Sequence, residues 1–170
     1  MHMPALMRQT LLPIVLLSQI LWSTQVCAQA STSAGLSIET LAERRVVRAS
    51  SEGAQVEFVA ADELHIGDEI FYTLRVRNTS DSAIASPAII KAMPRNTVYV
   101  DGSAVGPASD IEFSIDGGTV FAAPEELTVT AMPGVTRLAV ATDYTHIRWQ
   151  LRHPLAAGAT ALLRFRGVFK

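Results

Sequence analysis

The feature that most constrains this chain is a strict alternation of apolar and polar residues directly after a turn signal. In the stretch IGDEIFYTLRVRN (residues 66–78), every second residue from position 70 to position 76 is apolar: Ile70, Tyr72, Leu74 and Val76. Phe71 is the one apolar residue in the other phase. A period of two is typical of a β-strand with one face in a core and the other in water.

The same alternation returns near the end of the chain, at Ile147, Trp149 and Leu151 and again at Leu163, Phe165 and Phe169. Between these stretches are short segments of β-forming residues: QVEFVA, AIIKAM, TVYVDGSA, IEFSI, LTVT and RLAV. Turn sequences such as DGG, MPG and MPRN separate them. About eight or nine short strands with turn signals roughly every 8–12 residues, and no convincing helix, predict an all-β chain. We expect an antiparallel β-sandwich of about eight strands.

The first 30 residues have the three parts of a secretory signal peptide. Arg8 gives a positive start, LLPIVLLSQILW is an apolar run, and Ala28-Gln29-Ala30 is a small-x-small cleavage site. The apolar run is too short to cross a bilayer, which needs about 20 residues. Attachment of lipid to Cys27 would need a small residue directly before the cysteine, which this chain lacks. We therefore expect residues 1–30 to be removed and the exported protein to begin at Ser31.

Removal of this segment would also remove Cys27, the only cysteine of the 170 residues. The exported protein would then enter an oxidising compartment without a thiol, so packing alone must hold its fold. The formal net charge of −2 predicts a near-neutral, mixed surface, which disfavours nucleic acid and anionic membranes as partners. Residues 31–44, which begin with the small and flexible STSAG, are expected to be a lead-in linker, and the domain to span residues 45–170.

The alternating strand also resembles a known family. Gly67, Asp68, Tyr72 and Asn78 match the G-D-x-φ-x-Y-x-φ-x-φ-x-N strand of a bacterial conserved-repeat domain, catalogued as domain-of-unknown-function family eleven. The later segments IIKAMP, VYVDGS, IRW and LAAG are similar to the rest of its pattern, so the likeness covers about residues 54–169. The chain departs from the pattern at Ser80, where glycine is usual, and at Lys91-Ala92, where an acidic residue is usual.

The resemblance implies an immunoglobulin-like β-sandwich that serves as a surface or spacer module of secreted and cell-surface proteins. Because the family has no common catalytic residues, it implies none here. The residues themselves agree with this. No G-x-S-x-G nucleophile motif is present, and His65, His146 and His153 do not have the spacing of zinc ligands. Asp116-Gly117-Gly118 is interpreted as a hairpin turn rather than a calcium loop. The sequence thus predicts a non-enzymatic protein without a metal or cofactor.

The aromatic residues decide between two functions that remain open. Most of them, including Phe58 and Trp149, fall in the apolar phase of an expected strand and are predicted to lie in the core. Only Phe71, Tyr99 and Tyr144 are expected to be exposed, so these three are the candidate ligand-binding residues. The alternation favours a structural or adhesive module that contacts an unknown envelope or surface protein. The alternative is a carbohydrate-binding module that stacks a polysaccharide on exposed rings.

Either function belongs to an exported protein. The predicted location is the periplasm, the cell surface or the medium, without membrane insertion after signal cleavage.

Overall fold

The computed structural model describes residues 35–51 and 53–170, and the predicted signal peptide, with Cys27, falls outside this part of the chain. The described chain is all-β. The strands, in chain order, are β1 Leu36–Ser50, β2 Gly53–Ala60, β3 Glu69–Asn78, β4 Ala88–Ala92, β5 Thr97–Tyr99, β6 Ser109–Ser114, β7 Thr128–Met132, β8 Val135–Leu138, β9 His146–Leu151 and β10 Thr160–Phe169. A short 3-10 helix, η1, spans Pro124–Glu126. None of the described residues forms a helix with the length and apolarity needed to cross a membrane.

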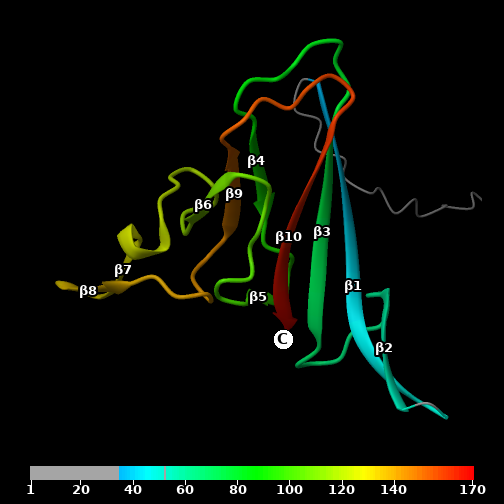
Figure 1. Ribbon diagram of the computed structural model, residues 1–170. Coiled ribbons are helices and arrows are strands. Elements are labelled where there is room, and N and C mark those ends of the chain that lie inside the picture. Colours follow the sequence, from blue (N-terminus) through cyan, green and yellow to red (C-terminus); the bar gives the residue numbers. More distant parts are fainter. Residues whose placement is uncertain (1–34, 52) are drawn as a thin grey trace, which may run out of the picture.

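The strands form two antiparallel sheets and a separate hairpin. The larger sheet has the order β2-β1-β3-β10-β5, and the smaller sheet has the order β4-β9-β6. Strands β7 and β8 pair only with each other. In Figure 1 the β7–β8 hairpin projects from one side of the molecule and the β1–β2 hairpin from the other. The structure therefore has a sandwich-like body with two projecting hairpins.

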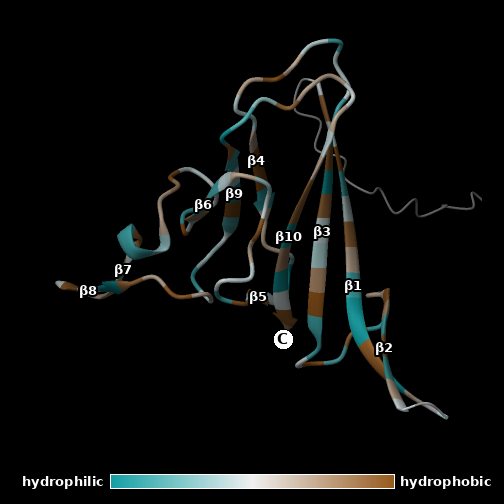
Figure 2. Cartoon of the chain, in the orientation of Figure 1, coloured by the Kyte–Doolittle hydropathy of each residue, from teal (hydrophilic) through white to brown (hydrophobic). Residues whose placement is uncertain are grey.

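The alternation that starts at residue 70 forms a strand with one buried face, as the sequence predicts. Its apolar phase is buried, and Leu74 and Val76 are completely inaccessible to solvent. Figure 2 shows hydrophobic and hydrophilic residues alternating along β3, which lies between β1 and β10. Trp149 of β9 and Phe165 of β10 are both buried, with ring centroids 6.1 Å apart. Because these strands belong to different sheets, the core is the layer between the two sheets.

The expected lead-in linker is largely part of the sheet. Strand β1 begins at Leu36, which is buried opposite Asn78, and Ile38 pairs with Val76. The apolar residues at positions 38, 41 and 42 suggest helical spacing, but pairing along nine positions of β3 determines the local structure. The folded domain thus starts before residue 45, because tertiary pairing overrides a weak local pattern.

The outer half of the β1–β2 hairpin corrects a second expectation. Beyond Arg44, which pairs with Ile70, β1 leaves β3 and pairs with β2 alone. Among the described residues no second sheet covers this part of the hairpin, so Phe58 is 49% exposed although the sequence places it in a core phase. Its ring packs edge-on against Phe71 of β3, with centroids 5.0 Å apart. Local alternation identifies the strand but does not show whether another layer lies over it.

Asn78, the last residue of β3, connects two loops through hydrogen bonds of its side chain. Its side chain is fully buried and donates hydrogen bonds to the carbonyl oxygens of Ser82 (2.7 Å) and Leu155 (2.8 Å). Its Oδ1 accepts hydrogen bonds from the backbone N–H (2.9 Å) and the hydroxyl (2.7 Å) of Ser80. The hydroxyl of Ser80 thus adds a hydrogen bond to this turn, which closes one end of the sandwich-like body.

Candidate functional site

Three aromatic rings from distant parts of the chain form a cluster beside β5. Phe113 of β6 stacks on Tyr144, which precedes β9, with centroids 4.4 Å apart. Tyr99 lies 4.9 Å from Phe113 and 6.0 Å from Tyr144. The Tyr99 hydroxyl accepts a hydrogen bond from the backbone N–H of Ala104 (3.0 Å). The cluster joins β5, β6 and the turn before β9.

The expectation that Tyr99 and Tyr144 are exposed is wrong. Their exposed fractions are 5% and 8%. Tyr99 pairs with Gly167, which continues the core-facing phase of β10, so the tyrosine turns inward over a residue without a side chain. Tyr144 lies between a turn and β9, outside any strand, where alternation gives no information about direction. Phe71, by contrast, is partly exposed on the outer face of the larger sheet.

A cavity of about 560 Å³ opens beside the aromatic cluster and is lined by Tyr99, Phe113 and Tyr144 among other residues. Two exposed carboxylates, Asp101 and Glu125, also line it. Burial raises the pKa of the Tyr144 phenol, and the nearby negative charge of Asp101 raises it further. The cavity therefore combines an aromatic base with a negatively charged rim.

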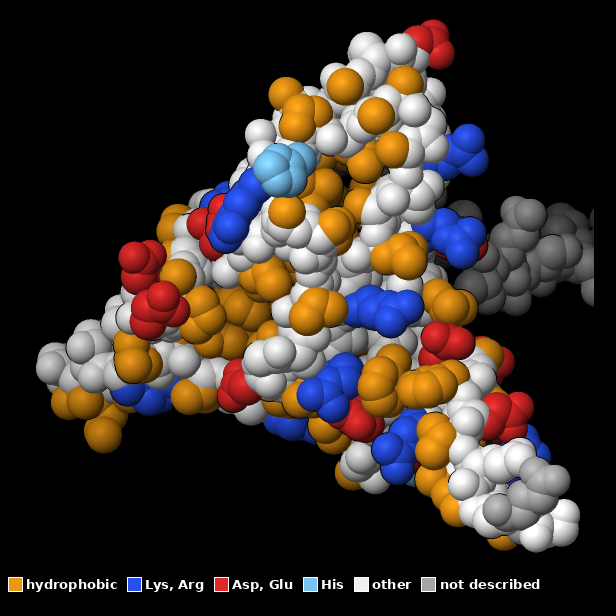
Figure 3. Space-filling view, viewed as in Figure 1, with side chains coloured by type: hydrophobic (Ala, Val, Ile, Leu, Met, Phe, Trp, Pro, Cys, Tyr) orange, Lys and Arg blue, Asp and Glu red, His pale blue; other side chains and the backbone are white. Residues whose placement is uncertain are grey.

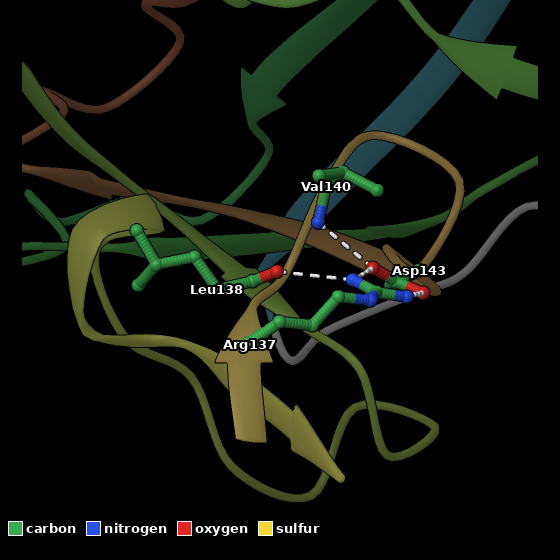
Figure 4. A network of polar contacts seen from close by, with 4 residues as sticks. All are labelled: Arg137, Leu138, Val140 and Asp143. Carbon is green, nitrogen blue, oxygen red and sulfur yellow. Dashed lines mark hydrogen bonds and ion pairs between the residues drawn. The ribbon is translucent and has the colours of Figure 1, made fainter. Parts of the chain in front are cut away.

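The segment that covers this cavity from one side is called here the arm, residues 124–140, and consists of η1, β7 and β8 with the residues that follow. An ion pair joins Arg137 of β8 to Asp143 in the turn before β9 (Figure 4). Arg137 donates from Nη1 to Oδ2 of Asp143 (2.6 Å) and from Nη2 to Oδ1 (2.9 Å), and the carboxylate also accepts from the N–H of Val140 (2.8 Å). These contacts, with the Arg137 bond first, lower the pKa of Asp143 to about 2. These contacts thus link β8 to the turn that leads into β9.

Apolar side chains are exposed along the arm. Met132, beside the turn of the hairpin, is 64% exposed, and Val135, Leu138 and Val140 are also exposed. Every residue of β8 is exposed, and in β7 only Val129 is partly buried, against the core. Exposed apolar groups gathered on a projecting element are typical of a contact surface.

A second cavity, of about 480 Å³, lies on the outer face of the larger sheet. Phe58, Phe71 and Val105 belong to its apolar part, and polar side chains complete it, including those of Thr73, Arg164 and Arg166. Arg166 is held by Glu69, whose Oε1 is 2.7 Å from its Nη1. This cavity therefore contains one of the three sequence-predicted ligand residues, whereas the other two line the first cavity.

The remaining chemically active side chains have structural roles. Asp116 accepts hydrogen bonds through Oδ1 from the Ser114 hydroxyl (2.7 Å), the Thr119 N–H (3.1 Å) and the Val120 N–H (3.0 Å). It therefore closes its own turn, and these bonds, above all the Ser114 bond, lower its pKa. His146 contacts the Thr145 hydroxyl through Nδ1 (3.1 Å). Within residues 35–51 and 53–170, no group of three or more His, Cys, Asp or Glu residues could hold a metal ion.

Comparison with protein-family models, with curated proteins and with solved structures finds no match to this chain. The resemblance to the conserved-repeat family therefore stays a prediction from the residues alone.

Sequence reasoning missed the two carboxylates at the rim of the first cavity and the Arg137–Asp143 pair. Asp101 and Glu125 are 24 positions apart and belong to different loops, so no spacing rule connects them. Arg137 and Asp143 are closer in sequence, but residues six apart in a turn have no fixed relative direction. These contacts become visible only when the arm is placed against the sandwich.

Proposed function

We propose that this chain is an exported, non-enzymatic module of the cell envelope or cell surface, with a structural or adhesive role through contact with another protein. The N-terminal segment supports export, since it has the charge, apolar run and cleavage site of a signal peptide. The sandwich supplies the rigid body of the module, and the two projecting hairpins supply its contact surfaces.

The observation that carries this proposal is the exposure of apolar side chains on the arm. Monomeric soluble proteins seldom leave such side chains gathered on a projecting element, because water contact with apolar surface is unfavourable. Met132 and Val135 pair across the end of the β7–β8 hairpin, so their side chains come together at its tip. A partner that covers this tip would remove both from water.

We also propose that the module is immunoglobulin-like in a broad sense. In an immunoglobulin constant domain, strands lettered in chain order form the sheets ABED and CFG. If β1, β3, β4, β5, β6, β9 and β10 are lettered A to G, the two sheets here have the orders A-B-G-D and C-F-E. The arrangement supports the proposal because it has two layers and because strands A, B, C, D and F occupy the immunoglobulin positions. It differs in that strands E and G have exchanged places between the two sheets.

Recovery of partners from envelope extract with an arm variant tests the protein-contact role. Met132→Thr with Val135→Thr makes the tip polar but keeps residues that favour strands. Leu162→Thr is the matched control, because Leu162 is exposed on the outer face of the larger sheet, away from the arm. We expect the wild type and the control to recover the same envelope protein and the arm variant to lose it. Recovery that is equal for all three proteins would contradict the proposal.

The cavity beside Phe71 favours carbohydrate binding as a second candidate function. Two phenylalanine rings next to hydroxyl and guanidinium groups provide both apolar contact and hydrogen-bond donors for a sugar. Retention of the protein in a polysaccharide gel, compared with retention of Phe71→Ala, tests this. Slower migration that Phe71→Ala abolishes would favour the carbohydrate-binding function over the protein-contact role.

A further inference from the structure

The cavity beside Tyr99 and Tyr144 has features that its structural role in the sandwich does not require. Its base is the stacked pair of Phe113 and Tyr144, and its wall on the arm side is apolar, with Pro124, Leu138 and Val140. Figure 3 shows hydrophobic side chains gathered between acidic ones where the arm joins the rest of the molecule. At about 560 Å³ the cavity is within the usual size range for ligand sites, roughly 300–1,000 Å³.

The charges around this cavity are all of one sign. Asp101 and Glu125 are exposed and line it from two different loops, and in the described part of the chain neither has an ion-pair partner. No Lys, Arg or His is among the described residues that line the cavity. A third carboxylate, Asp143, is close to Tyr144, but its charge is already balanced by Arg137. Two negative charges at the rim are therefore left without a counter-charge.

An apolar aromatic base with an uncompensated acidic rim is complementary to one kind of group. A cationic head on an apolar stem can place the stem on the rings and the head at the acidic rim. A neutral apolar ligand would leave the carboxylates without a partner, and an anion would be repelled by them. The shape and charge of the cavity thus favour the side chain of arginine or lysine.

We propose that this cavity binds an arginine or lysine side chain presented by a partner polypeptide. The inference rests on the proposed protein-contact function and names the chemistry of that contact. A polypeptide fits better than a free amino acid because the exposed apolar surface continues from Val140 and Leu138 at the cavity to Met132 at the tip of the arm. A basic side chain in the cavity would place the neighbouring residues of its chain against this surface.

Titration of the full chain with N-acetyl-arginine amide, followed by NMR of its aromatic and methyl groups, tests the charge requirement. We expect shifts at Tyr99, Tyr144 and Ala139, all of which line the cavity, and none with N-acetyl-citrulline amide, which has the same shape without the charge. Equal shifts with both compounds, or no shift with either, would overturn the inference.

A pair of charge variants tests the rim. Asp101→Asn with Glu125→Gln should weaken binding of the arginine probe by about tenfold, since charge-assisted contacts are lost. Asp62→Asn with Glu126→Gln removes two exposed carboxylates that do not line the cavity and should leave the affinity unchanged. Equal weakening by both pairs would mean that only net charge matters and would overturn the site.

A short peptide distinguishes a partner polypeptide from a free amino acid. An acetylated Leu-Arg-Val peptide should bind at least about tenfold more tightly than N-acetyl-arginine amide, and Met132→Thr with Val135→Thr should remove that gain. Equal affinity for peptide and single residue would overturn the polypeptide assignment. These measurements need neither export nor an envelope extract, so their failure is distinguishable from failure of the proposed function.

Discussion

Trp149 and Phe165 meet between the two sheets, with ring centroids 6.1 Å apart and essentially no exposed surface on either side chain. Their strands follow each other in the chain but belong to different sheets, so this contact joins the two layers. Trp149→Ala should lower the free energy of unfolding by about 3–5 kcal/mol through lost burial and a residual cavity. Urea denaturation, with Leu162→Ala on the exposed outer face as the control, measures the difference. A loss no larger than that of the control would contradict the assignment of Trp149 to the core.

The close approach of β5 and β10 depends on Gly167. A Cβ atom at this position would lie 2.2 Å from Cγ2 of Thr97, far inside contact distance. Gly167→Ala should therefore destabilise the protein by about 1–3 kcal/mol, as overpacking does. Thr97→Ser removes the opposing methyl group, so the double variant should recover most of the loss. Additive losses in this double-mutant cycle would show that the two residues do not contact each other.

The Arg137–Asp143 pair predicts a specific acid sensitivity. Because folding lowers the pKa of Asp143 from 3.8 to about 2, its contribution to stability is complete above pH 3.8 and is lost as the pH falls toward about 2. Asp143→Asn should be less stable than the wild type near neutral pH and should lose less stability across that acidic window. Unfolding curves at several pH values, with Asp62→Asn as the control, measure this. A wild-type decline that Asp143→Asn shares in full would rule out the pair as its source.

The export prediction concerns the N-terminus. If residues 1–30 form a cleaved signal peptide, sequencing of the exported protein should give Ser-Thr-Ser-Ala-Gly, starting at Ser31. Mass spectrometry of the same sample shows whether Cys27 is present. An exported form that keeps Met1, or that carries lipid on Cys27, would contradict this prediction.

Alternation alone was enough to locate most of the strands. Where one face of a strand packs on a second sheet, as in β3, β9 and β10, apolar side chains must recur every second residue, and the sequence shows this directly. In the outer half of the β1–β2 hairpin no described residues form a covering layer, so Phe58, which its phase predicts to lie in the core, is exposed instead. The sequence does not predict the start of β1, because this segment has no clear alternation of its own. It is a strand because it pairs with β3.

The candidate site was harder to predict, because it depends on contacts between loops. Phe71, Tyr99 and Tyr144 were selected as exposed rings, yet two of them are buried and line a cavity instead. The direction of Tyr99 follows from its partner Gly167, which is 68 positions away, and this register cannot be derived from either segment alone. The acidic rim depends in the same way on where the arm is held.

The central claim is that the tip of the arm contacts another protein. A photo-cross-linking amino acid at Met132 in the native host tests it most directly, with the same amino acid at Ala156 as the control. Ala156 is exposed in the loop between β9 and β10, and this loop runs along the top of the molecule in Figure 1, away from the β7–β8 hairpin. We expect one discrete cross-linked protein from position 132 and none from position 156. No product at position 132, or the same products at both positions, would contradict it.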